Sequence, residues 1–220
     1  MSAEFVARME DVLDLYAEPY DPQRPVVCFD ESSVQMLGHV REPMPARPGR
    51  PRREDCEYRR EGTRNLFMTC EPLAGWRHVA VTERRTREDF AHQMRWLVDE
   101  AYPEVEKVRV VLDNLNTHNW TSLYETFPAA EARRMVKKLE FHFTPKHGSW
   151  LNMAEIEFSI FSRGCLRQRL PDEESLVREI SALERHRNEA KAVIRWGFTT
   201  QDARTKLHRL YPDIPALTKY

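Results

Sequence analysis

The sequence predicts an α/β fold with a mixed sheet, formed by a three-strand meander plus two further strands, flanked by helices. Three β-rich segments come first, and each of the next two follows a helical segment. Meander strands pair antiparallel, whereas strand–helix–strand units give parallel neighbours, so the two patterns together produce a mixed sheet with helices on its faces. The 220 residues are 41% hydrophobic and 31% charged, which suits one domain with a sizeable core.

Hydrophobic spacing and chain breakers predict the individual elements. Strands are expected over residues 26–30 with an extension toward 37, on either side of a turn at 73–75, within 107–114 and within 138–145. Helices are expected over 4–17, 86–102, 118–138 with a break at Pro128, 150 to about 164, 173–192 and 200–210.

Cysteine spacing and missing motifs exclude several classes of site. The four cysteines lack the spacing and the nearby histidines of a zinc site, and they indicate a reducing, intracellular compartment. The glycine motifs that bind dinucleotides or nucleotide phosphates are missing. The acidic N-terminal segment does not resemble a signal peptide, and no apolar run approaches the roughly 20 residues of a bilayer span, so no membrane partner is expected.

Three acidic residues stand out by their positions. Asp30 ends the apolar run VVCF, Asp113 ends VRVVL, and Glu155 lies near the start of a predicted helix. Charged residues avoid core strands unless they are capped, paired or bound to metal. The carboxyl ends of neighbouring strands form the edge where α/β proteins commonly bind ligands, so the two aspartates are expected to meet there. Taken singly, each aspartate could equally be a turn former or a helix cap.

A cluster of three carboxylates predicts a metal site. Like charges raise one another's pKa values, and divalent cations remove that penalty. Mg²⁺ prefers oxygen ligands, and a few carboxylates plus substrate phosphate suffice for it. Two such ions can clamp the attacking and leaving oxygens of a phosphodiester. The alternative chemistry is a hydrolase that uses two carboxylates without metal, such as a glycosidase.

A proline- and arginine-rich segment is the best candidate for DNA contact. Residues 41–64 contain eight arginines against five acids and too few apolar residues to form core, so we expect a loop or an exposed ribbon. The stretch PGRPRR, residues 48–53, resembles the core of an AT-hook, an extended basic strip that lies in the minor groove. The expected contacts are Arg47, Arg50, Arg52 and Arg53. The alternative is a flexible solvated loop.

Three sequence motifs together resemble the signature of the mariner-superfamily DDE transposases, closest to the bacterial insertion-sequence branch. They are VVCFDES, VVLDNLNTH and FTPKHGSWLNMAEIEF. Asp30 matches the family's first acid, Asp113 lies in its L-D-N-x-x-x-H segment, and Glu155 closes its L-N-x-x-E segment. The resemblance runs from about residue 26 to 161, and more weakly to 212.

The resemblance implies a ribonuclease H-like catalytic domain that cleaves DNA and transfers strands at transposon ends. Two Mg²⁺ ions, for which Mn²⁺ can substitute, would be held by the three catalytic acids. Around them the resemblance places Asn114, His118 and Asn152, and it adds Lys146 as a DNA contact. His118 could instead be an ordinary histidine at the surface or at the start of a helix.

The sequence departs from the family at two places and leaves one ligand open. Asp113 and Glu155 are 42 positions apart (155 − 113 = 42), longer than is usual, and KHGSW replaces the family's Tyr-Ser-Pro. Glu157 is a rival third ligand, about 200° around the helix from Glu155. Only one of the two can easily reach the aspartates. Glu31 is adjacent to Asp30 but is expected to point to the other face of its strand.

The expected domain organisation is a linker helix at 1–24, a catalytic core at 25–165 and a C-terminal helical extension at 166–220. The family's helix-turn-helix units have no counterpart before residue 26, so a separate DNA-recognition chain is a candidate partner. Double-stranded DNA at transposon ends and target sites is the expected substrate, with a homodimer on DNA and a cytoplasmic location at the bacterial nucleoid. The competing hypothesis is an inactive relic or an accessory DNA-binding protein of the same fold.

Overall fold

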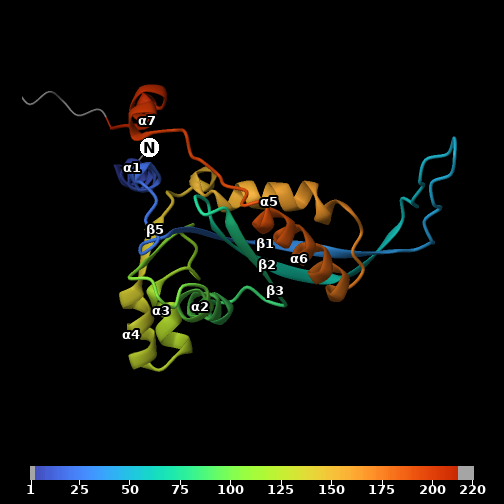
Figure 1. The fold of residues 1–220 in the computed structure, drawn as a ribbon, viewed down its shortest axis with the longest axis horizontal. Helices are drawn as coiled ribbons and strands as arrows, with labels where there is room; N and C mark the ends of the chain where they lie inside the picture. The colour runs from blue at the N-terminus through green and yellow to red at the C-terminus, as the bar shows by residue number, and fades with distance from the viewer. Residues whose placement is uncertain (1–2, 213–220) are drawn as a thin grey trace, which may run out of the picture.

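The computed structural model describes residues 3–212 and contains a five-stranded mixed sheet (Figure 1). The strands are β1 Val26–His39, β2 Tyr58–Glu71, β3 Trp76–Thr82, β4 Val108–Leu112 and β5 Leu139–Phe143, in the order β3-β2-β1-β4-β5. β1, β2 and β3 pair antiparallel as a meander, whereas β4 lies parallel to both β1 and β5. The predicted meander plus two further strands is therefore confirmed.

Helices cover both faces of the sheet (Figure 1). One face carries α1 Ala3–Ala17, α5 Ala154–Arg163 and α6 Glu173–Glu189, with α7 Thr200–Lys206 beside α1. The other face carries α2 Arg87–Trp96, α3 Trp120–Thr126 and α4 Ala129–Lys138. A π-helical turn, Leu97–Ala101, continues α2, and short 3-10 turns occupy Ser149–Leu151, Cys165–Arg167 and His208–Leu210. Within residues 3–212, no helix has the length and apolar character needed to cross a bilayer.

Alternation along the strands divides the core into two layers. Cys28 and Val111 belong to the layer under α1, α5 and α6, whereas Val27 and Val110 belong to the layer under α2, α3 and α4. Successive side chains of a strand point to opposite faces, so each central strand contributes to both layers. This alternation also decides to which face Asp30, inside β1, points.

The largest difference from the predicted elements is the length of the β1–β2 hairpin. β1 continues to His39 and β2 begins at Tyr58, so the two strands extend beyond the helical layers as a ribbon (Figure 1). The sequence conceals the β2 half of this ribbon because residues 58–63 are exposed and have no apolar alternation. The predicted break at Pro128 is confirmed, since this residue is the N-cap of α4.

The predicted domain boundaries stay predictions. Met9 of α1 and Ile180 of α6 are buried in the same cluster as the sheet residues, so both flanking helices pack on the core. The end of the predicted C-terminal extension, residues 213–220, lies outside the described residues.

Candidate active site

Asp30 and Asp113 lie at matching positions on neighbouring parallel strands. The β1–β4 register pairs Cys28 with Val111. Two residues further along each strand, the same register places Asp30 beside Asp113. Alternation along β1 directs the Asp30 carboxylate toward the α5 face, whereas Asp113 directly follows the last residue of β4 and its carboxylate contacts His118.

Asn152 fixes the start of α5 against β1. Its side-chain amide donates to the carbonyl of Phe29 at 2.8 Å and its side-chain oxygen accepts from the N–H of Ala154 at 3.1 Å. Asn152 is fully buried, so both bonds are shielded from water. One residue thereby ties the first turn of α5, which carries Glu155, to the residue that precedes Asp30. The role of Asn152 that the geometry supports is to position these two acids.

Asp30 is a buried carboxylate with a raised pKa. Burial raises the pKa of Asp30 to about 7, although a 2.8 Å hydrogen bond from the N–H of Glu31 works against the shift. The negative charges of Asp113 and Glu155 raise the pKa further, so the three acids lie within electrostatic reach of one another. Within residues 3–212, none of the three forms an ion pair with a lysine or an arginine.

His118 is buried between two acids on the opposite face of the sheet. Its Nδ1 lies 2.5 Å from Oδ1 of Asp113 and its Nε2 lies 2.6 Å from Oε2 of Glu31. Burial lowers the pKa of His118, but the contacts with Asp113 and Glu31 outweigh it and raise the pKa to about 9. At neutral pH the ring is a cation, and its contact with the carboxylate restrains Asp113. The alternative of a surface histidine is wrong, because His118 is 1% exposed.

The Glu157 carboxylate is bound by two arginines and is not available as a metal ligand. It is fully buried and accepts hydrogen bonds from Arg77 at 3.1 Å and from Arg187 at 2.8 and 2.9 Å. Glu155 is exposed and its charge acts on Asp30. Of the two rivals for the third ligand position, the geometry therefore favours Glu155.

Sequence comparison places this arrangement in a family. Residues 25–177 match the family described as DDE superfamily endonuclease. The chain belongs to this family. No significant match was found among curated proteins.

Solved structures show the same fold at low sequence identity. The Mos1 strand transfer complex matches with a TM-score of 0.59 and 14% identity over 86% of this chain and 56% of that one. The Mos1 mariner paired end complex with Mn matches with a TM-score of 0.57 and 14% identity over 87% and 58%. The ribonuclease H-like fold and the similarity to mariner transposases are confirmed, while the bacterial branch stays a prediction. The chain spans less than three fifths of those two Mos1 chains.

Divalent metal is the cofactor that the DDE family implies, and the donor set fits it. Asp30, Asp113 and Glu155 offer only oxygen ligands, which Mg²⁺ and Mn²⁺ accept. Their mutual repulsion has no lysine or arginine to offset it within residues 3–212. In that part of the chain, no three His, Cys, Asp or Glu side chains are close enough together to hold an ion as they stand. A bound ion would therefore have to draw the three carboxylates together.

The remaining predicted residues, Asn114 and Lys146, lie near Asp113. Asn114 is exposed and forms no hydrogen bond with Asp113, so a role in orienting that acid is not supported. Lys146 is exposed in the turn that follows β5. Because the N–H of Thr144 donates to the carbonyl of Leu112 at 2.9 Å, this turn lies beside the Asp113 segment.

The arginine-rich segment has a different shape from the expected strip. The N–H and C=O groups of Arg47 and Arg50 pair at 2.9 and 2.8 Å around Pro48 and Gly49, and Gly49 has the positive φ of 75° that such a turn requires. The segment is thus the tip of the β1–β2 ribbon, because the proline and glycine suit a tight turn. It is exposed, so the expected basic surface remains, whereas an AT-hook-like extended strip is wrong for this unbound form.

Sequence reasoning missed two residues that support the site. Glu31 points away from Asp30 as expected, yet it reaches His118 and through it Asp113. Tyr16 of α1 donates to the carbonyl of Leu151 at 2.9 Å, which ties the first helix to the segment before α5. Alternation along β1 was the available signal for Glu31, because it places an acid among the buried residues of the α2 and α3 layer. Tyr16 gave no signal beyond its apolar helical spacing.

Proposed function

We propose that this chain is the catalytic domain of a transposase, which cleaves DNA at transposon ends and transfers the cut strand to target DNA. Asp30, Asp113 and Glu155 would hold two Mg²⁺ ions, or Mn²⁺ in their place. The observation that carries the proposal is the placement of three acids without a lysine or arginine partner among residues 3–212. The pairing of β1 with β4 brings Asp30 beside Asp113, and Asn152 ties the start of α5, which carries Glu155, to β1. Family membership supports it, because the family is described as an endonuclease.

The chain's own residues divide the work in this proposal. The bound ions would supply an activated water or 3′-hydroxyl and stabilise the departing oxygen. His118 contacts and restrains Asp113, and Asn152 ties the start of α5, which carries Glu155, to the residue before Asp30. Restrained ligands lose little freedom when metal and substrate bind, which favours a productive geometry.

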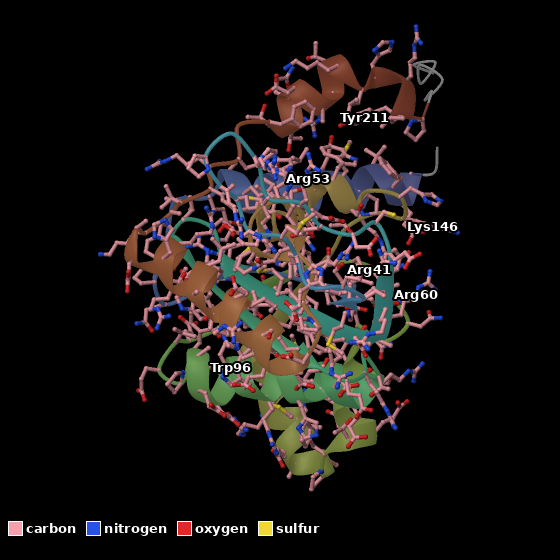
Figure 2. All side chains as sticks on the ribbon, turned by 90° about the vertical axis from the view of Figure 1, so that its right-hand side faces the viewer. Arg41, Arg53, Arg60, Trp96, Lys146 and Tyr211 are labelled. Carbon is pink, nitrogen blue, oxygen red and sulfur yellow. The ribbon has the colours of Figure 1, made fainter. Side chains whose placement is uncertain are left out.

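Exposed basic residues outline a path for DNA. Arginines are exposed along the β1–β2 ribbon, and we propose that Arg47, Arg50, Arg52 and Arg53 contact the phosphate backbone. In the view of Figure 2, Lys146, Arg41 and Arg60 lie toward the same side, while Figure 1 shows β5 and the β1–β2 ribbon toward opposite ends of the long axis. A duplex that crosses this side would meet both the ribbon and the turn after β5.

Partners follow from the same proposal. The matching Mos1 structures are described as paired end and strand transfer complexes. By analogy, two copies of this chain would bring two DNA ends together, with a separate helix-turn-helix chain as a further candidate partner. A bacterial insertion-sequence origin and action at the nucleoid belong to the proposal as well.

Nicking of supercoiled plasmid tests this proposal. We expect nicking with Mg²⁺ or Mn²⁺, none with EDTA, and joining of an added oligonucleotide 3′-end to plasmid DNA. Asp113→Asn is expected to abolish both reactions. Nicking that persists in EDTA would favour a metal-independent hydrolase. Plasmid binding without nicking would favour an accessory protein or a relic, and nicking without joining would leave an endonuclease.

A further inference from the structure

A basic hollow opens next to the Asp113 segment, between the start of α1 and the turn that follows β5. It has an empty volume of about 750 Å³. It is lined by Glu4, Phe5, Arg8, Asn114, Pro145, Lys146 and His147. Asn114 directly follows Asp113 in the chain, so the hollow adjoins the proposed metal site. Its walls come from three segments that are far apart in the sequence, residues 4–8, residue 114 and residues 145–147.

The hollow has an unpaired positive charge. Lys146 is exposed and forms no ion pair within the described residues, and His147 is exposed beside it. Arg8 pairs with Glu4 through Nη2 at 2.8 Å, whereas its Nη1 is buried and has no hydrogen-bond partner. A buried donor without a partner is unfavourable, so this nitrogen is suited to an acceptor that arrives with a ligand.

The backbone fixes the side chains that line the hollow. The N–H of Gly148 donates to the carbonyl of Pro145 at 2.8 Å and closes the turn. His147 adopts a positive φ of 65° in this turn, and a Cβ on Gly148 would lie 2.5 Å from Pro145. The guanidinium of Arg8 lies 5.8 Å from the ring centre of Phe143, which holds it beside the turn. The basic groups are therefore largely preorganised, so little order is lost when an anion binds.

We propose that this hollow binds a backbone phosphate of the DNA strand that enters the active site, with Arg8 and Lys146 as the main ligands and Asn114 and His147 at its edges. The inference rests on the proposed function, which makes DNA the substrate. Arginine presents a planar fork of donors that matches phosphate oxygens, and lysine adds a compact charge. A phosphate held here would position the adjoining phosphodiester relative to Asp113.

The test is DNA binding in EDTA, so that the proposed metal site takes no part. Fluorescence anisotropy measures the affinity for a labelled duplex between about 50 and 200 mM salt. Each lost phosphate contact makes the dependence of log affinity on log salt shallower by about one unit. We expect this change for Lys146→Ala and for Arg8→Gln. Arg133→Ala and Lys137→Ala, which remove exposed charges on α4 on the opposite face, are the matched controls.

A second measurement identifies the phosphate itself. Methylphosphonate substitution, made one position at a time along one strand, removes single charges from the duplex. The wild-type chain is expected to lose affinity at one position to which the Arg8→Gln, Lys146→Ala double variant is insensitive. If Arg8→Gln fails to fold, Lys146→Ala combined with His147→Asn tests the hollow alone, since both side chains are exposed and Asn tolerates a positive φ.

The outcomes separate this inference from the proposed function. Hollow variants that keep the wild-type affinity and salt dependence overturn the inference, even if the wild-type chain nicks plasmid with Mg²⁺. The same holds if the wild-type chain binds no DNA at the lowest salt. Loss of nicking in Asp113→Asn, with unchanged binding in EDTA, would support the proposed function independently of the hollow.

Discussion

The Nδ1 atom of His118 lies 2.5 Å from Oδ1 of Asp113, the acid that directly follows β4. Glu31, on the same face as His118, lies 2.6 Å from the other ring nitrogen. The sheet edge therefore carries a buried acid–histidine–acid chain that ends on a proposed metal ligand.

Replacing Glu31 with Gln tests whether this chain positions Asp113. The change removes the charge that helps keep His118 protonated, so the restraint on Asp113 weakens while the metal ligands stay intact. We expect a roughly 10- to 100-fold loss of plasmid nicking or of apparent Mg²⁺ affinity, as is usual for groups that orient metal ligands. The Mg²⁺ dependence of the nicking rate measures it. Glu104→Gln, an exposed acid away from the site, serves as control. An unchanged Mg²⁺ dependence in Glu31→Gln would exclude the positioning role.

The raised pKa of Asp30 makes the stability of the metal-free protein depend on pH. Its pKa rises from an ordinary 3.8 to about 7 on folding, so the folded chain binds the extra proton between about pH 4 and 7. The free energy of unfolding therefore falls as pH rises through this window, by up to about 4 kcal/mol. Urea denaturation in EDTA measures this change. Asp30→Asn is expected to flatten the window, and saturating Mg²⁺ to restore stability at pH 8.

The contribution of His118 to stability depends on pH in a separate range. Its pKa rises from 6.5 to about 9, so its stabilising contribution is complete below about pH 6.5 and is lost as pH rises through about 9. Ring NMR signals would report this titration directly. A single stability transition near pH 4, unaffected by Asp30→Asn, would contradict both assignments.

Glu155 and Glu157 are expected to respond in opposite ways to replacement by Gln. Glu157→Gln leaves Arg77 and Arg187 without their buried acid and should destabilise the fold by about 3–5 kcal/mol. Glu155→Gln changes an exposed residue and should alter stability little while abolishing nicking. Thermal unfolding and plasmid nicking, measured on both variants, show which of the two glutamates supports stability and which supports activity. Normal nicking by Glu155→Gln would remove it from the site.

Asn152→Ala is expected to separate positioning from metal binding. It deletes the hydrogen bonds to Phe29 and Ala154 and leaves a buried carbonyl and a buried N–H unpaired, at a cost of about 1–3 kcal/mol each. The start of α5 then loosens, so nicking should fall while stability falls moderately. Asn116→Ala, an exposed change, is the control for both measurements. Full activity in a destabilised Asn152→Ala chain would leave Asn152 a purely structural role.

Two acids of this site could be predicted from the sequence because each follows an uninterrupted run of core residues. The parallel pairing of β1 and β4 brings Asp30 and Asp113 together, although Asp30 lies inside β1 and only Asp113 follows the end of a strand. The order of the elements was readable for the same reason, since strong apolar runs alternate with helical spacing.

The other features of the site could not be predicted, because they depend on contacts between residues that are distant in the sequence. Helix geometry alone could not separate Glu155 from Glu157, because the deciding partner Arg77 comes from β3, 80 residues away. The pairing of Glu31 with His118 likewise depends on how far the segment after β4 folds back under the sheet. The length of the β1–β2 ribbon was not predicted, because the exposed residues at the start of β2 have no hydrophobic period.

Mn²⁺ binding measured by electron paramagnetic resonance tests the central claim most directly, because it detects the ion at the three acids without depending on DNA cleavage. The account predicts that the wild-type chain binds Mn²⁺, that Asp113→Asn and Asp30→Asn lose this binding, and that Glu31→Gln weakens it. Mn²⁺ binding by Asp113→Asn that equals the wild type would contradict the account.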